Sequence, residues 1–147
     1  EALLDGLCEG RRSFAELRGA DFVSAIRNLV PPAGARRLAE IAPDAVVLPG
    51  GRKAKVTYSE GAAPFLESRL QDFFGMRQGP SAAMGRVPIV LHLLAPNYRA
   101  VQVTTDLAGF WERHYPGIAR ELRRKYPRHA WPDDPLTASP PVAGQRR

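Results

Sequence analysis

Basic side chains are most concentrated between Glu112 and Arg128. This segment holds six basic and two acidic residues, so it carries 6 − 2 = +4 of the chain's formal net charge of +6. Its basic residues are Arg113, Arg120, Arg123, Arg124, Lys125 and Arg128. Side chains of this kind neutralise phosphate groups, so the segment is predicted to contact a polyanion, with nucleic acid as the first candidate. The alternative is a solvated helix surface that has no partner of its own.

Further basic residues stand near predicted turns. Lys53 and Lys55 lie on the polar face of a predicted strand, while Arg86 and Arg99 lie beside loops. They are candidates for tracking a nucleic-acid backbone, although the two lysines also suit an edge strand that must not aggregate. Trp131 lies in a proline-rich coil, where it is a candidate base-stacking platform or lid. Packing inside the domain is the favoured interpretation of this tryptophan.

Motifs of catalysis and metal binding are missing from the sequence. It contains no Gly-Lys pair, so the phosphate loop of P-loop ATPases is absent, and it has no Asp-Glu-x-His box and no Gly-x-Ser-x-Gly elbow. Cys8, His92, His114 and His129 lack the paired spacing of a zinc site. His92 lies in an apolar run and is interpreted as a core histidine. We therefore expect no catalytic residue, no bound cofactor and no metal in this chain.

The composition is that of a folded domain. Hydrophobic residues make up 44% and charged residues 24% of the 147 residues, which is enough for one domain with a core. The single cysteine excludes an intramolecular disulfide bond and fits a reducing compartment. No apolar run approaches the ~20 residues of a membrane span. A cytoplasmic chain without membrane contact is therefore expected.

Helices and strands must position these residues. Apolar residues recur at helical spacing through the first 44 residues, and prolines divide them into short helices. Two hairpins follow, Val46–Tyr58 around a Pro-Gly-Gly turn and Val87–Thr104. The residues of the second hairpin that are expected to be buried are Val87, Ile89, Leu91 and Leu93. The predicted fold class is α+β, with a helical N-terminal segment and two β-hairpins that form a small antiparallel or mixed sheet flanked by amphipathic helices.

The flanking helices follow from apolar spacing. A short edge strand is expected at 64–66 and an amphipathic helix from Leu66 to Phe74. Thr105 and Asp106 are both candidates to cap a helix over 107–114. A further helix runs from Gly117 to about Lys125, with its arginines opposite an apolar stripe. That stripe consists of Tyr115, Ile118, Leu122 and Tyr126. The expected organisation is a helical segment at 1–44, an α+β domain at 45–135 and a disordered tail at 136–147.

Three stretches resemble one known family. Residues 48–58, LPGGRKAKVTY, are similar to a hairpin of HrpB-type helicases, and residues 65–76, FLESRLQDFFGM, are similar to the helix that follows it. The third stretch, 85–135, ends in RKYPRHAWPDDP, which resembles the C-terminal signature of the family. The match covers 48–135 well and the first 44 residues loosely. The chain thus resembles the C-terminal domain of bacterial HrpB-family DEAH-box ATP-dependent helicases.

The resemblance implies a longer enzyme that binds ATP and Mg²⁺ in its helicase core and acts on RNA. The catalytic motifs of that enzyme would lie N-terminal to this sequence, so none of its catalytic residues is carried over. The chain itself is expected to be a non-catalytic accessory domain whose partners are single-stranded RNA and its own helicase core. One rival is a protein–protein module that recruits the helicase to a partner. The other is an independent enzyme, which the missing motifs disfavour.

Overall fold

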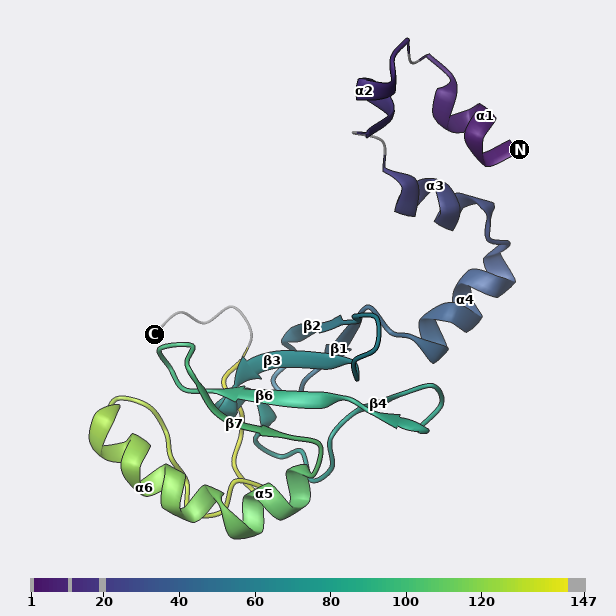
Figure 1. Ribbon diagram of the computed structural model, residues 1–147. Coiled ribbons are helices and arrows are strands. Elements are labelled where there is room, and N and C mark those ends of the chain that lie inside the picture. Colours follow the sequence, from purple (N-terminus) through teal and green to yellow (C-terminus); the bar gives the residue numbers. More distant parts are fainter. Residues whose placement is uncertain (1, 11, 19–20, 143–147) are drawn as a thin grey trace. The chain divides into compact units, whose positions relative to one another are not determined.

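The computed structural model describes residues 2–10, 12–18 and 21–142. The chain divides into two compact units, Glu1–Glu40 and Ile41–Arg147. Unit 1 is helical and unit 2 contains all the strands of the described residues (Figure 1). No helix in the described ranges is long and apolar enough to cross a membrane.

Unit 1 confirms the prediction of short helices. They are α1 (Ala2–Cys8), α2 (Phe14–Arg18), α3 (Phe22–Leu29) and α4 (Pro32–Ile41), whose last residue already belongs to unit 2. The carboxylate of Asp21 accepts a hydrogen bond from the backbone N–H of Ser24 at 2.9 Å and so caps the start of α3. Pro32 is the first residue of α4, a position where a proline loses no helical hydrogen bond.

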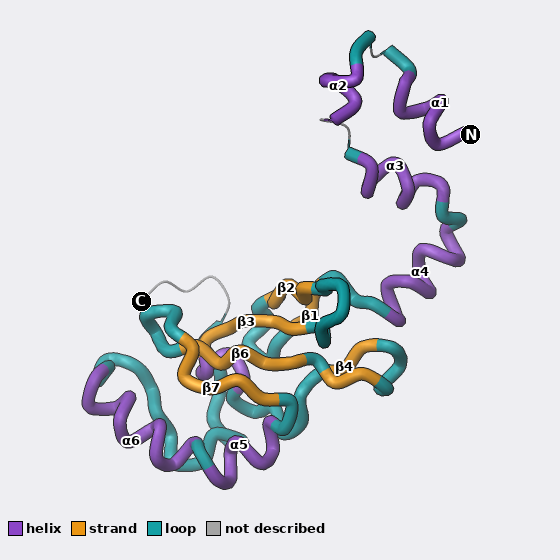
Figure 2. The backbone as a smooth tube through the Cα atoms, viewed as in Figure 1, coloured by secondary structure: helices purple, strands orange, loops and turns teal. Residues whose placement is uncertain are grey.

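Unit 2 is built on a mixed five-stranded sheet. Its strands are β1 (Ala45–Val47), β2 (Lys53–Thr57), β3 (Phe65–Arg69), β6 (Val90–Leu94) and β7 (Ala100–Thr104). They lie in the order β1-β2-β3-β6-β7, and only β3 and β6 run parallel (Figure 2). The short strands β4 (Ser81–Ala82) and β5 (Val87–Pro88) pair separately. Both predicted hairpins and the α+β class are confirmed.

The prediction for Pro64–Phe74 was wrong in two respects. β3 lies at the centre of the sheet rather than at an edge, because it pairs with β2 on one side and with β6 on the other. The expected helix is replaced by this strand and a single 3₁₀ turn, η1 (Leu70–Phe73). Leu66 and Leu70 fit helical spacing, but Leu66 and Ser68 also fit the alternation of a strand, and pairing with β6 selects the strand.

The second hairpin is shorter than predicted. Ile89, Leu91 and Leu93 are buried as expected, whereas Val87 is 36% exposed. Val87 pairs with Ala82 in the small β4–β5 ribbon and does not extend β6. Pro88 has no N–H to donate to a sheet ladder, and β5 ends at this residue before β6 begins at Val90.

Two helices cover one face of the sheet. They are α5 (Leu107–Arg113) and α6 (Tyr115–Lys125), which lie together on the same side of the strands (Figure 1). The largest fully buried side chains between sheet and helices include Phe73, Phe74, Leu91, Phe110 and Tyr115. This packing leaves the opposite face of the sheet without a covering helix from the described part of unit 2.

The chain after α6 returns along the core. Leu136 and Ala138 are partly buried against the core, and Gly50 in the β1–β2 turn lies directly against the backbone carbonyl of Pro141. Residues 136–142 were expected in a disordered tail, and within the described residues they make these contacts. The rest of that segment, 143–147, lies outside the described residues.

Candidate nucleic-acid interface

Helix α6 is fixed by its apolar stripe. Tyr115, Ala119 and Leu122 are buried, and Ile118 is partly buried against the same core. The arginines on the other side of the helix are therefore held at the surface. Basic residues also fill the last turn, where they complement the negative end of the helix dipole.

The guanidinium groups of Arg120 and Arg124 are exposed on this helix. Within the described part of the chain neither makes an ion pair. Arg128, just beyond α6, is also exposed and has no ion pair among those residues. No acidic side chain of the described residues compensates these three guanidinium groups, so they are available for contact with phosphate.

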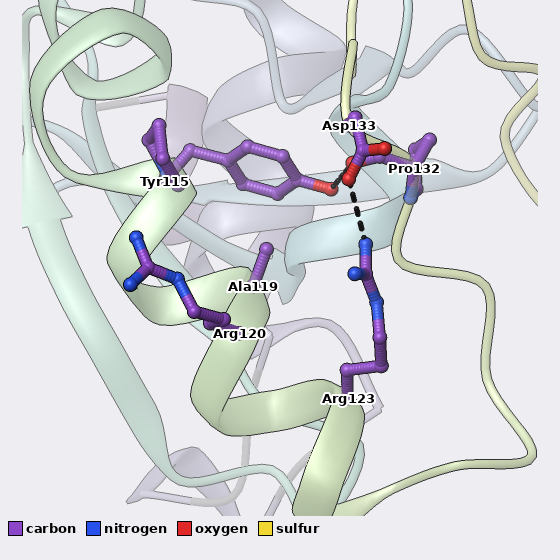
Figure 3. Close-up of a pocket in the computed structure, with 7 residues that line it drawn as sticks. Tyr115, Ala119, Arg120, Arg123, Pro132 and Asp133 are labelled. Carbon is purple, nitrogen blue, oxygen red and sulfur yellow. Dashed lines mark hydrogen bonds and ion pairs between the residues drawn. The ribbon is translucent and has the colours of Figure 1, made fainter.

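Arg123 is held differently from its neighbours. Its Nη2 donates to the backbone carbonyl of Trp131 at 2.5 Å. The same atom donates to Oδ1 of Asp133 at 2.9 Å (Figure 3). The guanidinium thus ties α6 to the segment that follows it, and its charge is compensated by Asp133. Arg123 therefore holds residues 131–133 against α6, whereas the sequence pattern predicted that it faces outward with Arg120 and Arg124.

Tyr115 provides a second tie at the start of the helix. Its hydroxyl donates to the backbone carbonyl of Pro132 at 2.7 Å. Burial raises the pKa of this hydroxyl to about 12, with Arg123 acting against the increase and Asp133 adding to it. The tyrosine is therefore a neutral donor at any ordinary pH.

A small cavity lies between α6 and residues 132–133. Its volume is about 330 Å³, and its lining residues are Tyr115, Pro116, Ala119, Arg120, Arg123, Pro132 and Asp133. Figure 3 shows Arg120 and Arg123 on successive turns of the helix, with only Arg123 bonded to Asp133. The cavity therefore offers an anion one uncompensated guanidinium, that of Arg120.

Arg113 belongs to α5 and is also paired. Its Nη2 lies 2.7 Å from Oδ2 of Asp106, while Oδ1 of the same carboxylate accepts the backbone N–H of Gly109 at 2.8 Å. The Gly109 N–H, and then Arg113, lower the pKa of Asp106. The predicted cap is confirmed, and Arg113 braces that cap.

Trp131 is buried. Only 5% of its surface is exposed, and its Nε1 donates to the backbone carbonyl of Tyr126 at 3.0 Å. A ring in this position fills the core and satisfies its polar atom there. A base would stack on it only after the segment 126–131 had moved.

The remaining basic candidates lie on other elements. Lys53 and Lys55 are exposed on β2, which is an internal strand, so the edge-strand explanation for these lysines was wrong. Arg86 lies in the β4–β5 turn and Arg99 in the β6–β7 turn, and both are exposed. His92 lies on the sheet face away from the helices, with its side chain 29% exposed, and is not the core histidine that was expected.

A buried carboxylate escaped the sequence interpretation. Asp72 is 2% exposed and accepts a hydrogen bond from Ser68 Oγ at 2.7 Å, while Arg52 Nε and Arg69 Nη2 lie 3.1 and 3.5 Å from its two oxygens. The one available signal was an acidic residue inside the apolar run LQDFF. A carboxyl group at this depth requires such partners, so the cluster is structural.

Donors from the rest of unit 2 also hold the returning segment by its backbone carbonyls. Gln71 Nε2 donates to Ala130 O at 2.8 Å, and the backbone N–H of Gly75 donates to Pro135 O at 2.9 Å. With Arg123 and Tyr115, four donors thus fix the carbonyls of residues 130, 131, 132 and 135. The returning segment, 126–135, is therefore a strap that is anchored along most of its length.

Comparisons with known proteins agree with this architecture. A family model described as "HrpB_C: ATP-dependent helicase C-terminal" matches residues 3–135. The curated protein "ATP-dependent RNA helicase HrpB" of Escherichia coli (strain K12) is 37% identical over 131 residues, which cover 89% of this chain and 16% of that protein. The chain thus spans about a sixth of the length of this relative.

Two solved structures share the fold. The E. coli DExH-box NTPase HrpB superposes with a TM-score of 0.87 at 36% identity, covering 94% of this chain and 17% of that one. A structure of the E. coli DEAH/RHA helicase HrpB gives a TM-score of 0.69 at 34% identity, covering 88% of this chain and 16% of that one. The similarity includes most of the residues of both units.

Proposed function

The chain belongs to the HrpB C-terminal family of ATP-dependent helicases, and on this premise we propose that it is a non-catalytic accessory domain that extends the RNA-binding surface of such a helicase. The observation that carries the proposal is the state of the arginines around α6. Arg120, Arg124 and Arg128 face solvent without an ion pair in the described residues, while the buried stripe of α6 holds that helix in place.

The contact would be made with the phosphates of single-stranded RNA. Arg120 borders the cavity, and Arg124 lies one turn further along α6, so two phosphates of an extended strand can be neutralised in succession. Such contacts position a strand and do not read its sequence. Arg123 would act indirectly, because it fixes the strap that forms the other wall of the cavity.

The chemistry of ATP belongs to the rest of the protein in this proposal. The sequence has no phosphate loop and no acidic box. ATP and Mg²⁺ would bind in the helicase core, which uses them to move on RNA in the cytoplasm. The present domain would then prolong the contact between the enzyme and its RNA and supply no catalytic group.

Unit 1 favours a second role, which is docking on the helicase core. Ile26 and Leu29 on α3 and Leu38 on α4 are each more than half exposed. Ile26 and Leu29 are three residues apart and so share one face of α3, and adjoining exposed apolar side chains are typical of a surface that contacts protein. Replacing Ile26 and Leu29 by serine should abolish copurification with the ATPase region of the same protein, supplied as a separate polypeptide. A protein partner outside the helicase is the alternative, and it would be supported if the unaltered chain did not copurify with that ATPase region.

The salt dependence of RNA binding tests the first role. The affinity of the 147-residue chain for a single-stranded RNA should fall on a log–log plot against salt by about 0.7 per phosphate contact. The slope should be the same for unrelated RNA sequences. A slope near zero, or an affinity that varies strongly with RNA sequence, would contradict phosphate contact by this domain.

A further inference from the structure

The face of the sheet that α5 and α6 do not cover carries its own set of side chains. Because residues alternate along a strand, the burial of Leu66 and Leu91 places their neighbours Phe65 and His92 on the opposite face. The face continues across the neighbouring strands, because Phe65 pairs with Val90 and His92 pairs with Val103. Val103 is half-exposed, so the face is open within the described residues of unit 2.

Two rings are stacked at the middle of this open face. The centroids of Phe65 and His92 lie 4.9 Å apart with an interplanar angle of 17°. Glu67 Oε1 lies 3.4 Å from Nδ1 of His92 and orients the imidazole. Phe65 is partly exposed and the side chain of His92 is 29% exposed, so the stacked ring pair remains within reach of a ligand.

Cations lie on the same face as the ring pair, on the neighbouring strand β2 and at the end of β3. Lys53 and Lys55 alternate with the buried Ala54 and Val56 and are exposed on the same face. Arg69 follows Glu67 by two residues on β3 and so shares the face with it. Arg69 is paired with the buried Asp72, so Lys53, Lys55 and Glu67 leave this face with 2 − 1 = +1 charge in the described strands.

Flat rings bordered by cations suit one class of ligand. Proteins that bind single-stranded nucleic acid combine aromatic rings, on which bases stack, with basic side chains along the backbone. A protein partner would be expected to cover a continuous apolar patch, whereas here Lys53, Lys55 and Glu67 interrupt the apolar residues. The mixture favours nucleic acid.

We propose that the open sheet face, centred on Phe65 and His92, is a stacking platform for a base of single-stranded RNA. Lys53 and Lys55 hold the adjoining phosphates in this arrangement. The proposal goes beyond the contact assigned to α6, because it concerns the other face of the sheet and the bases of the RNA. Each of the two surfaces can therefore be tested without the other.

The test compares two oligonucleotides of equal charge. One is a single-stranded 12-mer of uridine, and the other is a 12-mer of the same backbone with abasic sites in place of the bases. Fluorescence anisotropy with the 147-residue chain should show about tenfold tighter binding of the base-bearing strand for each stacked base. Phe65→Leu and His92→Gln should each reduce this preference and leave the affinity for the abasic strand unchanged.

Controls separate this surface from α6. Tyr98→Asn removes an exposed ring at the β6–β7 turn and should keep the preference. The double change Arg120→Gln and Arg124→Gln should weaken the binding of both oligonucleotides equally and leave the preference for the base-bearing one unchanged. Equal binding of the two strands by the unaltered chain, or a preference that survives both ring substitutions, would overturn the platform and leave the α6 contact standing.

A direct measurement avoids dependence on the folding of variants. Uridine replaced by 5-iodouridine should crosslink on irradiation to peptides that contain Phe65 or His92 in the unaltered chain. Crosslinks confined to other parts of the chain would overturn the proposal, as would the absence of any binding to either strand.

Discussion

The Nε atom of Arg52 lies 3.1 Å from Oδ2 of Asp72, a carboxylate that is almost completely buried. Arg52 stands before β2 and Asp72 lies in η1, so the contact joins two of the sequence stretches that resemble the family. Ser68 and Arg69 complete the surroundings of the carboxylate. The hairpin at 48–58 and the stretch at 65–76 are thus held together by a charged cluster at the edge of the core.

Removing the arginine from this cluster should be costly. Arg52→Met should lower the free energy of unfolding by about 3 kcal/mol, the lower end of the range for breaking a buried ion pair, since Arg69 stays near the carboxylate. Urea denaturation followed by tryptophan fluorescence measures this change. Lys53→Met, the same substitution at the exposed neighbouring residue, should change stability by less than about 0.5 kcal/mol. Equal effects of the two substitutions would exclude the cluster as a determinant of stability.

The hydroxyl of Tyr115 should make a pH-dependent contribution to the free energy of unfolding. Tyr115→Phe leaves the partly buried carbonyl of Pro132 without its donor and should cost about 1–2 kcal/mol at neutral pH. The pKa of Tyr115 rises from 10.0 to about 12 in the folded chain. Because the folded pKa lies above the unfolded one, the contribution is complete below pH 10 and is lost as the pH rises toward 12.

The stability gap between the unaltered chain and Tyr115→Phe should therefore narrow in this range. Urea denaturation at pH 7.5, 9.5 and 11 checks this expectation. A gap that stays constant or widens above pH 10 would show that the hydroxyl does not keep its proton through the bond to Pro132.

Two helical glycines should respond in opposite directions to alanine. A Cβ at Gly109 would overlap the side chains of Asp106 and Arg113, so Gly109→Ala should disturb the cap of α5 and cost about 1 kcal/mol. Gly117 in α6 has open space around its Cβ position, and Gly117→Ala should stabilise the chain by about 0.4–1 kcal/mol. Thermal unfolding of both variants provides the comparison. A stabilised Gly109→Ala variant would mean that Arg113 and Asp106 do not brace the helix start.

The break at Pro88 can be tested by comparing two apolar residues. Leu91 is fully buried between β3 and β7, and Leu91→Ala should cost about 2–5 kcal/mol through the cavity that it leaves. Val87 is exposed in the β4–β5 ribbon, and Val87→Ala should cost less than about 1 kcal/mol. If chemical denaturation showed similar losses of stability for Leu91→Ala and Val87→Ala, Val87 would belong to the core strand.

Local patterns were sufficient to predict several elements. The stripe of α6 and the cap at Asp106 depend on residues within one or two turns of each other, and both were predicted correctly. β3 was not, because its position depends on pairing with β6, which is about 25 residues away in sequence. Nothing in the residues Phe65–Arg69 alone distinguishes a central strand from the start of a helix.

The site was harder to predict than the fold. Arg120, Arg123 and Arg124 share a helix face, but only the return of residues 131–133 past α6 shows that Arg123 is occupied. The strap is held by its backbone carbonyls, which every residue type has, so no sequence pattern identifies them in advance. The open sheet face went unnoticed as a unit for the same reason, since Phe65 and His92 meet only through the parallel pairing of β3 and β6.

The central claim is that Arg120 and Arg124 contact phosphates of single-stranded RNA. Its most direct test is the salt dependence of RNA binding by the double variant Arg120→Gln, Arg124→Gln, compared with Arg36→Gln, Arg37→Gln, which removes the same charge from α4. The slope of log K against log salt should fall by about 1.4 in the first variant, since each lost contact removes about 0.7. It should stay near that of the unaltered chain in the second. Equal slopes and affinities in both variants would contradict the claim and leave docking on the helicase core as the function of the domain.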